Sequence, residues 1–309
     1  MEFSQSKIDE VREIVKNKYL TMYPDKMERY YHILGVAKMA KYLASIYNVD
    51  ESRAEICGLV HDYYKYEDNE TMKTLIDSWD LEECLKYPVL FHSYASANAL
   101  SNVFGINDLE MKDAIRNHVF GKTNQSKLGE IILISDYTEE TRQYSDCIKV
   151  RNVLLSGNLI KAIYDSTVYT IKFIESKNIK PHPMQIEVLH EYERKLQMSK
   201  LVDVINGLKR INPESVVAYD SNLSSPFFNF IVVATVGSVR QASQALTYIK
   251  EEIEKEGFSI KSTEGFDSEW VLIDGYDFLV HIMTEDERER LSIDKLYMNL
   301  NKLDIEQYL

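Results

Sequence analysis

The stretch Gly58-Leu59-Val60-His61-Asp62-Tyr63-Tyr64-Lys65 places an imidazole and a carboxylate side by side, directly after an apolar run. Both side chains are common metal ligands. Four more residues of these types stand alone within the first 136 residues, separated by about one helix and one loop: His32, His92, His118 and Asp136. Helical bundles build metal sites from single side chains that different helices project inward. Four imidazoles and two carboxylates are enough for two metal ions, which indicates hydrolysis of a phosphate ester.

Each of these histidines taken alone has an ordinary explanation as a core or surface residue. The joint pattern is what favours a metal site, because four of the seven histidines belong to it. A single metal needs only the set His32, His61, Asp62 and Asp136. The pair His92 and His118 provides for a second metal. Imidazole with carboxylate suits iron, manganese, zinc or nickel, and the set of ligands does not choose among them.

The adjacent His61 and Asp62 pose a geometric problem. Successive residues on a helix point about 100° apart, so these two side chains cannot share one face. Both can still bind metal if a metal pair lies over the helix, with Asp62 bridging the two ions and His61 binding one of them.

Composition points to a two-domain globular protein. The chain has 309 residues, 45% of them hydrophobic, and a net charge of -13. The charge is -5 over residues 1–198 and -8 over residues 199–309. An acidic C-terminal part argues against direct binding to a nucleic-acid backbone, and it fits either a basic protein partner or simple solubility.

The chain carries no sign of export or membrane insertion. We find no apolar run long enough to cross a bilayer, and residues 1–5 do not resemble a signal peptide. Cys57, Cys84 and Cys147 lie far apart, which predicts reduced thiols in a cytoplasmic protein.

The hydrophobic pattern changes near residue 211. Before that point the spacing is helical, and Asp50-Glu51-Ser52 opens the helix that leads to the His61-Asp62 pair. Helices are predicted over residues 28–47, 70–78, 92–104, 108–119, 127–140, 158–177 and 183–210. Strands are predicted at 216–219, 227–235, 270–273 and 278–282, with a helix over 239–256 and a helical tail from about 285. The fold class is therefore an all-α helical bundle (1–198) followed by a smaller α/β domain with a mixed sheet (199–309).

The N-terminal motifs resemble the HD-domain phosphohydrolases, and within them the YqeK-type symmetrical bis(5′-nucleosyl)-tetraphosphatases. The matching segments are Arg29-Tyr30-Tyr31-His32, residues 58–65, Phe91-His92, Ala114 to His118, Ser135-Asp136-Tyr137 and Pro181-His182-Pro183. The chain departs from the family pattern at Ser93, where a glycine is usual, and at Val119-Phe120. In the segment after Asp136, Glu139 and Arg142 are kept, while isoleucine and proline are lost.

The resemblance implies a metal-dependent enzyme that cleaves diadenosine tetraphosphate into two ADP. It implies two divalent or mixed-valence metal ions, with iron favoured. A metal pair lowers the pKa of a shared water, and the resemblance implies that Asp62 and Lys65 are the catalytic residues. Lys65, Arg29 and Arg142 supply cations for the polyphosphate, although each could equally be an ordinary surface charge.

The C-terminal segments resemble the ribosomal silencing factor family, also called RsfS or Iojap. The matching segments are Phe230 to Thr235, Glu264-Gly265, Trp270 to Asp274, Val280-His281-Ile282, Arg288-Glu289 and Leu296. The family implies binding to the large ribosomal subunit through its protein L-fourteen, which blocks subunit joining.

The two resemblances together imply a nucleotide hydrolase fused to a translation silencer. One alternative is an N-terminal domain that no longer hydrolyses a substrate and serves as an adaptor for the ribosome-binding domain. A second alternative is a hydrolase with another nucleotide substrate.

Overall fold

A computed structural model describes residues 2–222 and 224–309, which form two compact units. The first unit comprises the chain up to Leu155 together with Leu159–Tyr192, and the second comprises Ser156–Asn158 and Glu193–Leu309. One helix, α11 (Pro183–Lys209), contributes residues to both units. The boundary between residues 198 and 199 therefore falls inside a helix, and we keep it as a proposal about the domain limits.

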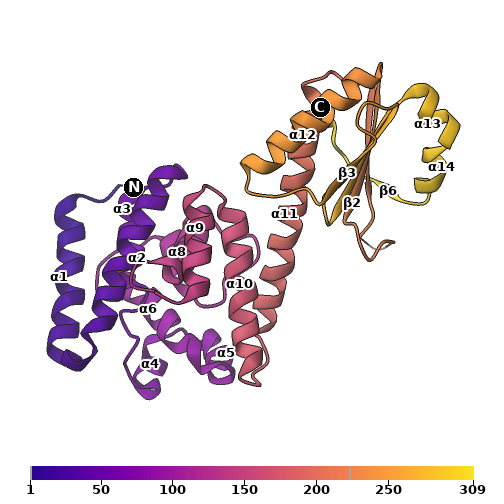
Figure 1. The fold of residues 1–309 in the computed structure, drawn as a ribbon. Helices are drawn as coiled ribbons and strands as arrows, with labels where there is room; N and C mark the ends of the chain where they lie inside the picture. Colours follow the sequence, from indigo (N-terminus) through magenta and orange to yellow (C-terminus); the bar gives the residue numbers. More distant parts are fainter. Residues whose placement is uncertain (1, 223) are drawn as a thin grey trace. The chain divides into compact units, whose positions relative to one another are not determined.

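The first unit is a bundle of helices, as the sequence predicts (Figure 1). Its longer helices are α1 (Gln5–Met22), α2 (Met27–Ile46), α3 (Glu51–Val60), α6 (Phe91–Asn102), α7 (Leu109–Arg116), α8 (Lys127–Thr138), α9 (Ser145–Leu155) and α10 (Leu159–Ser176). Two short helices, α4 (Asn69–Leu75) and α5 (Leu81–Lys86), precede α6. The individual predictions omitted α1, α5 and α9. None of the helices within the described residues is long and apolar enough to cross a bilayer.

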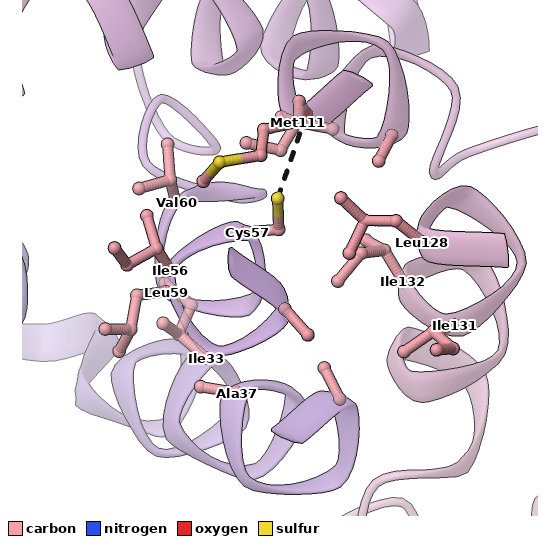
Figure 2. Close-up of a cluster of buried hydrophobic side chains, with 14 of the residues drawn as sticks. Ile33, Ala37, Ile56, Cys57, Leu59, Val60, Met111, Leu128, Ile131 and Ile132 are labelled. Carbon is pink, nitrogen blue, oxygen red and sulfur yellow. Dashed lines mark hydrogen bonds between the residues drawn. The ribbon is translucent and has the colours of Figure 1, made fainter. Parts of the chain in front are cut away.

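The core of this unit lies where α2, α3, α7 and α8 meet (Figure 2). The side chains of Ile33, Ile56, Met111 and Ile132 are fully removed from solvent there. Gly58 allows the close approach of two of these helices, because a Cβ on it would lie 2.5 Å from the Cα of Ala37. The end of α3 is thereby held against α2.

The second unit contains a six-stranded mixed sheet in the order β3-β4-β5-β2-β1-β6. The strands are β1 (Ser215–Asp220), β2 (Phe230–Val236), β3 (Ser262–Glu264), β4 (Trp270–Asp274), β5 (Phe278–Thr284) and β6 (Asn301–Lys302). The central pair β2 and β5 is parallel, and the other pairs are antiparallel. Helix α12 (Val239–Lys255) follows β2, and its N-cap is Ser238, whose hydroxyl accepts from the Gln241 amide.

Helices cover both faces of this sheet (Figure 1). The C-terminal part of α11 and all of α12 pack on one face through residues such as Val204, Leu208 and Ile249. On the other face, α13 (Glu285–Leu291) and α14 (Ile293–Tyr297) enclose a smaller cluster that includes Val233 and Met283. Every residue of β2 is buried, as expected for a central strand covered on both sides.

Two predictions for this unit need correction. The helical tail from about residue 285 is wrong beyond Tyr297, because Asn301 and Lys302 form strand β6 beside β1. Ser292 adopts a left-handed conformation and already divides the tail into two helices. Strand β2 begins at Phe230 rather than at 227. The side chain of Phe227 is 74% exposed, so β-propensity alone placed the start of that strand too early.

A polar chain is buried between the sheet and α14. His281 on β5 receives a hydrogen bond at Nδ1 from the Trp270 indole at 3.2 Å, and its Nε2 lies 2.8 Å from the Tyr297 hydroxyl. The Trp270 and His281 rings are stacked. Burial lowers the pKa of His281 to about 4, so the neutral ring is the form that the fold accommodates.

The Gly58→Ala variant tests the close contact between α2 and α3. The added methyl group overlaps the backbone at Ala37, so we expect a loss of about 1–3 kcal/mol in the free energy of unfolding. Chemical denaturation measures this change. The matched control is Gly129→Ala in α8, where a Cβ would meet nothing closer than 3.5 Å, and where alanine should stabilise the helix by up to about 1 kcal/mol. Equal effects of the two substitutions would contradict the close-contact argument.

The buried His281 should make the second unit less stable in acid. The unfolded chain takes up a proton on this ring near its ordinary pKa of about 6.5, whereas the folded chain does so only near 4, so stability is lost as the pH falls through that window. From pH 7 to pH 4.5 the wild type should lose about 2–3 kcal/mol more than His281→Gln. Denaturation followed by fluorescence of Trp270, in proteins that also carry Trp79→Phe, measures the difference at both pH values. Parallel losses in the two proteins would rule out this role of His281.

Candidate metal centre

Six side chains from five parts of the bundle converge inside the first unit. His32 comes from α2, the His61-Asp62 pair follows α3, and His92 lies in the first turn of α6. His118 follows α7, and Asp136 lies in the last turn of α8. The four imidazoles and Asp62 are buried, while the Asp136 side chain is partly exposed. The sequence predicted this set of residues, and the fold brings all six together.

The ligand atoms form two groups that share one carboxylate. His32, His61 and Asp62 offer atoms within 4.8 Å of one another, and so do Asp62, His92 and His118. Asp62 Oδ2 lies 3.5 Å from His61 Nε2, and Asp62 Oδ1 lies 3.2 Å from His92 Nε2. Each oxygen of Asp62 therefore faces a different group, so this carboxylate could contribute to the binding of a cation in either group.

Asp136 lies on the side of the first group. Its Oδ1 is 3.0 Å from His32 Nε2 and 3.9 Å from His61 Nε2. In the second group, His92 Nε2 is 3.3 Å from His118 Nε2. We call the set His32, His61, Asp62 and Asp136 the first seat, and the set Asp62, His92 and His118 the second seat.

The unpaired atoms of the centre fit a cation. His61 Nε2 is buried and makes no hydrogen bond within the part of the chain that is described, while buried His32 Nε2 and Asp62 Oδ1 face other members of the centre, Asp136 and His92. Buried polar atoms without partners are costly, and atoms that all face one region are satisfied together by a metal ion. Nitrogen and carboxylate donors suit the transition metals named above.

Hydrogen bonds at the far side of two rings set their tautomers. His61 Nδ1 lies 2.8 Å from the Gly58 carbonyl, and His118 Nδ1 lies 2.7 Å from the Ile115 carbonyl. A carbonyl oxygen only accepts, so Nδ1 of each ring carries the proton and Nε2 presents its lone pair to the centre. Burial lowers the pKa of His61 to about 3 and that of His92 to about 4, which keeps both rings neutral and able to bind metal.

The turn after α3 resolves the problem of the adjacent ligands. The helix was predicted to continue through His61 and Asp62, but it ends at Val60 and a series of turns follows. The Tyr19 hydroxyl donates to the Asp62 carbonyl at 2.9 Å and holds this turn in place. Burial opposes ionisation of the Asp62 carboxyl, but the Lys65 ammonium nevertheless helps to keep its pKa well below the usual value.

The three predicted cations lie at the edge of the centre. Arg29 donates to Asp62 Oδ2 at 3.0 Å, and Arg142 donates to Asp136 Oδ1 at 2.8 Å. Lys65 Nζ lies 3.5 Å from Asp62 Oδ1 and 3.0 Å from His92 Nε2. Lys65 reaches Asp62 from within the turns rather than from the next turn of a helix. All three side chains are partly exposed, so each can also meet a ligand that enters from solvent.

Arg116, Asn117 and Phe120, which are neighbours of His118 in the sequence, line a pocket of about 210 Å³. His182 also lines this pocket. The His182 ring stacks on Phe120 with ring centroids 4.5 Å apart, and Tyr87 meets it edge-on at 4.2 Å. His182 Nδ1 accepts from the Met184 amide, so its Nε2 carries the proton and donates to Glu83 at 2.7 Å. Pro181 precedes His182 and Pro183 is the first residue of α11, so His182 is held between two prolines at the entrance to that helix.

Sequence reasoning assigned no role to two residues that support the centre. One is Tyr19, which carries no motif and becomes relevant only through folding. The other is Glu139, which was noted only as part of a motif. It is fully buried, and its Oε1 lies 3.1 Å from His32 Nδ1.

Comparison with known proteins divides the chain in the same way. The HD domain model matches residues 29–141, and the model described as ribosomal silencing factor during starvation matches residues 196–308. The N-terminal part is 36% identical to the symmetrical bis(5′-nucleosyl)-tetraphosphatase of Halalkalibacterium halodurans over 174 residues, or 56% of this chain and 91% of that one. The C-terminal part is 30% identical to ribosomal silencing factor RsfS of Chromobacterium violaceum over 102 residues, or 33% of this chain and 82% of that one.

A solved structure resembles the N-terminal part. It is the predicted HD superfamily hydrolase involved in NAD metabolism from Clostridium acetobutylicum, with 30% identity and a TM-score of 0.53 over 63% of this chain and 100% of that one. The chain thus belongs to the HD-domain symmetrical bis(5′-nucleosyl)-tetraphosphatase family in its N-terminal part and to the RsfS family in its C-terminal part.

Proposed function

We propose that the first unit hydrolyses diadenosine tetraphosphate symmetrically, consuming one water and releasing two ADP. The observation that carries this proposal is the pair of ligand groups that share Asp62. The choice of substrate follows the names of two relatives of this chain, which are symmetrical bis(5′-nucleosyl)-tetraphosphatases. The residues of the two seats would hold two metal ions, which would supply a water of lowered pKa and neutralise charge on the phosphate oxygens. Iron is the metal we propose, with manganese, zinc and nickel as alternatives.

The protein's own cations orient the polyphosphate. A guanidinium has five N–H donors, and Asp136 takes only those on Nε and Nη2 of Arg142, so donors remain for phosphate oxygens. Arg29 is anchored on the other carboxylate of the first seat, and Lys65 adds a point charge near the second seat. Because these cations are fixed before substrate arrives, they hold the inner phosphates in place at little cost in entropy.

We propose that the pocket at His182 binds one nucleoside of the substrate. It is lined by aromatic and polar side chains, and Arg116, Asn117 and Phe120 flank the ligand His118 in sequence. Flat rings such as Phe120 and His182 suit stacking with a purine. Arg116 among the lining residues adds a cation that can meet a phosphate of the bound nucleotide.

The Asp62→Asn and Asp62→Ala variants test the hydrolase. We expect loss of bound metal at both seats and a fall in kcat of more than about 10³-fold, because Asp62 serves both groups. Far-UV circular dichroism should show unchanged helical content. Wild type with iron(II) or manganese(II) should convert diadenosine tetraphosphate to ADP alone, as separated by chromatography.

The control for this experiment is Asp25→Ala, an exposed residue of the same unit, which should keep full activity. Full activity in an Asp62 variant would remove the mechanism. ATP and AMP as products would refute symmetrical cleavage. A wild type that binds metal but releases no product would favour the adaptor alternative, and turnover of only another nucleotide in a substrate panel would favour the second alternative.

We also propose that the second unit binds the large ribosomal subunit in the cytoplasm, through its protein L-fourteen, and blocks subunit joining. The family match over residues 196–308 carries this proposal. A pocket of about 690 Å³ beside Trp270 supports it, because Glu264, Asp267, Glu269 and Glu287 line the pocket against the single cation Arg290. An acidic surface of this kind suits a basic ribosomal protein.

Cosedimentation tests the ribosome proposal. The full chain should sediment with isolated large subunits and reduce their joining to small subunits. Glu264→Lys should weaken binding by roughly fivefold, equivalent to about 1 kcal/mol, because it places a like charge opposite the basic partner. Glu254→Lys on α12, outside this pocket, is the matched control and should bind as wild type. Sedimentation with small subunits only, or with neither subunit, would overturn the assignment.

A further inference from the structure

A buried carboxylate lies behind the first seat. Glu139 directly follows α8, three residues after Asp136, and its side chain is fully removed from solvent. Its Oε1 is 3.1 Å from His32 Nδ1 and 2.5 Å from the Thr141 hydroxyl, while its Oε2 accepts from the Thr141 amide at 2.7 Å. A buried charge is stable only when such partners surround it.

Two further contacts fix the position of this carboxylate. Gly35 lies one turn after His32 on α2, and a Cβ there would be 2.3 Å from Glu139 Oε2. The missing side chain thus makes the space that the carboxylate fills. From α9, the Arg151 guanidinium donates to the carbonyl oxygens of Thr138, Glu139 and Arg142 at 2.5, 2.6 and 2.6 Å. The backbone around Glu139 is therefore held from both sides.

His32 differs in this respect from the two other ligands whose Nδ1 contacts are known. The Nδ1 atoms of His61 and His118 face neutral backbone carbonyls three residues earlier in their own segments. His32 Nδ1 instead faces an ionised side chain from an element 107 residues away in the sequence. A carboxylate holds the Nδ1 proton more strongly than a carbonyl does, and it makes Nε2 a more basic ligand.

We propose that Glu139 is the positioning residue of the first seat. It fixes His32 in the tautomer whose Nε2 lone pair faces the metal, and it raises the metal affinity of that seat relative to the second seat. Outer partners of metal-binding histidines commonly change metal affinity by about 10–100-fold. This inference rests on the proposed two-metal function, which is why its test reads metal binding at each seat rather than turnover.

The test is a titration of metal-free full-length protein with manganese(II), followed by calorimetry and by electron paramagnetic resonance of the free ion. Wild type should bind two ions. In Glu139→Ala the affinity for one ion should fall by about 10–100-fold, while the affinity for the other stays within about threefold. The affinity of Glu139→Gln for that ion should lie between those of wild type and Glu139→Ala. Its amide oxygen still accepts from His32 Nδ1 but carries no charge.

Two further variants separate this role from a structural one. Glu140→Gln changes the neighbouring carboxylate, which is exposed and pairs with Lys38 at 3.0 Å, and it should bind as wild type. Gly35→Ala keeps Glu139 but displaces its carboxylate, and it should weaken one site in the same direction as Glu139→Ala. Because alanine favours a helix, this variant tests positioning without removing a buried charge.

The outcomes distinguish the inference from the function on which it rests. A wild type that binds no manganese would overturn the proposed metal centre itself. A wild type with two sites, combined with unchanged affinities in both Glu139→Gln and Gly35→Ala, would overturn the role of Glu139 alone. Equal weakening of both sites would also overturn it, because the contact with His32 serves the first seat only.

Discussion

The organisation of the first unit depends on one buried carboxylate with imidazoles on both sides. Asp62 faces His61 through one oxygen and His92 through the other, and Arg29 meets it from the edge. Isolated, such a charge would be costly to bury. The bundle accommodates it by ending α3 at Val60, so that a turn aims adjacent ligands into one space. The closeness of α2 and α3 at Gly58 holds that turn against His32.

The second unit follows a different physical rule. Its central strands β2 and β5 are covered on both faces, so their side chains pack in two separate clusters. The polar chain of Trp270, His281 and Tyr297 lies on one of these faces and is satisfied internally. Its acidic pocket is lined by Glu264, Asp267, Glu269 and Glu287 and is separate from these packed clusters. The first unit thus gathers its candidate ligands in a buried centre, whereas the acidic residues of the second unit line a surface pocket.

Local pattern predicted the elements well where packing and propensity agree. The strands predicted at 270–273 and 278–282 are confirmed as β4 and β5, which pair antiparallel around a turn closed by the Gly275 amide donating to the Phe278 carbonyl. The helix predicted over 239–256 is confirmed as α12, which ends at Lys255, and Gly257 just after it has a φ of 75° that glycine adopts readily. The strand β6 was not predictable, because two exposed residues pair with β1 only through the tertiary fold. The end of α3 at Val60 was not predictable from the sequence either, because the apolar spacing through Val60 gives no sign that the helix stops there.

The sequence by itself determined the class of each part and the six candidate ligands, because residue type and order persist in any conformation. Tertiary structure alone decided that Asp62 faces two groups, that Arg29 and Arg142 are anchored on the ligand carboxylates, and that Glu139 lies behind His32. These relations join residues up to 107 positions apart in the chain. No local spacing encodes such contacts, because they arise from the packing of whole helices.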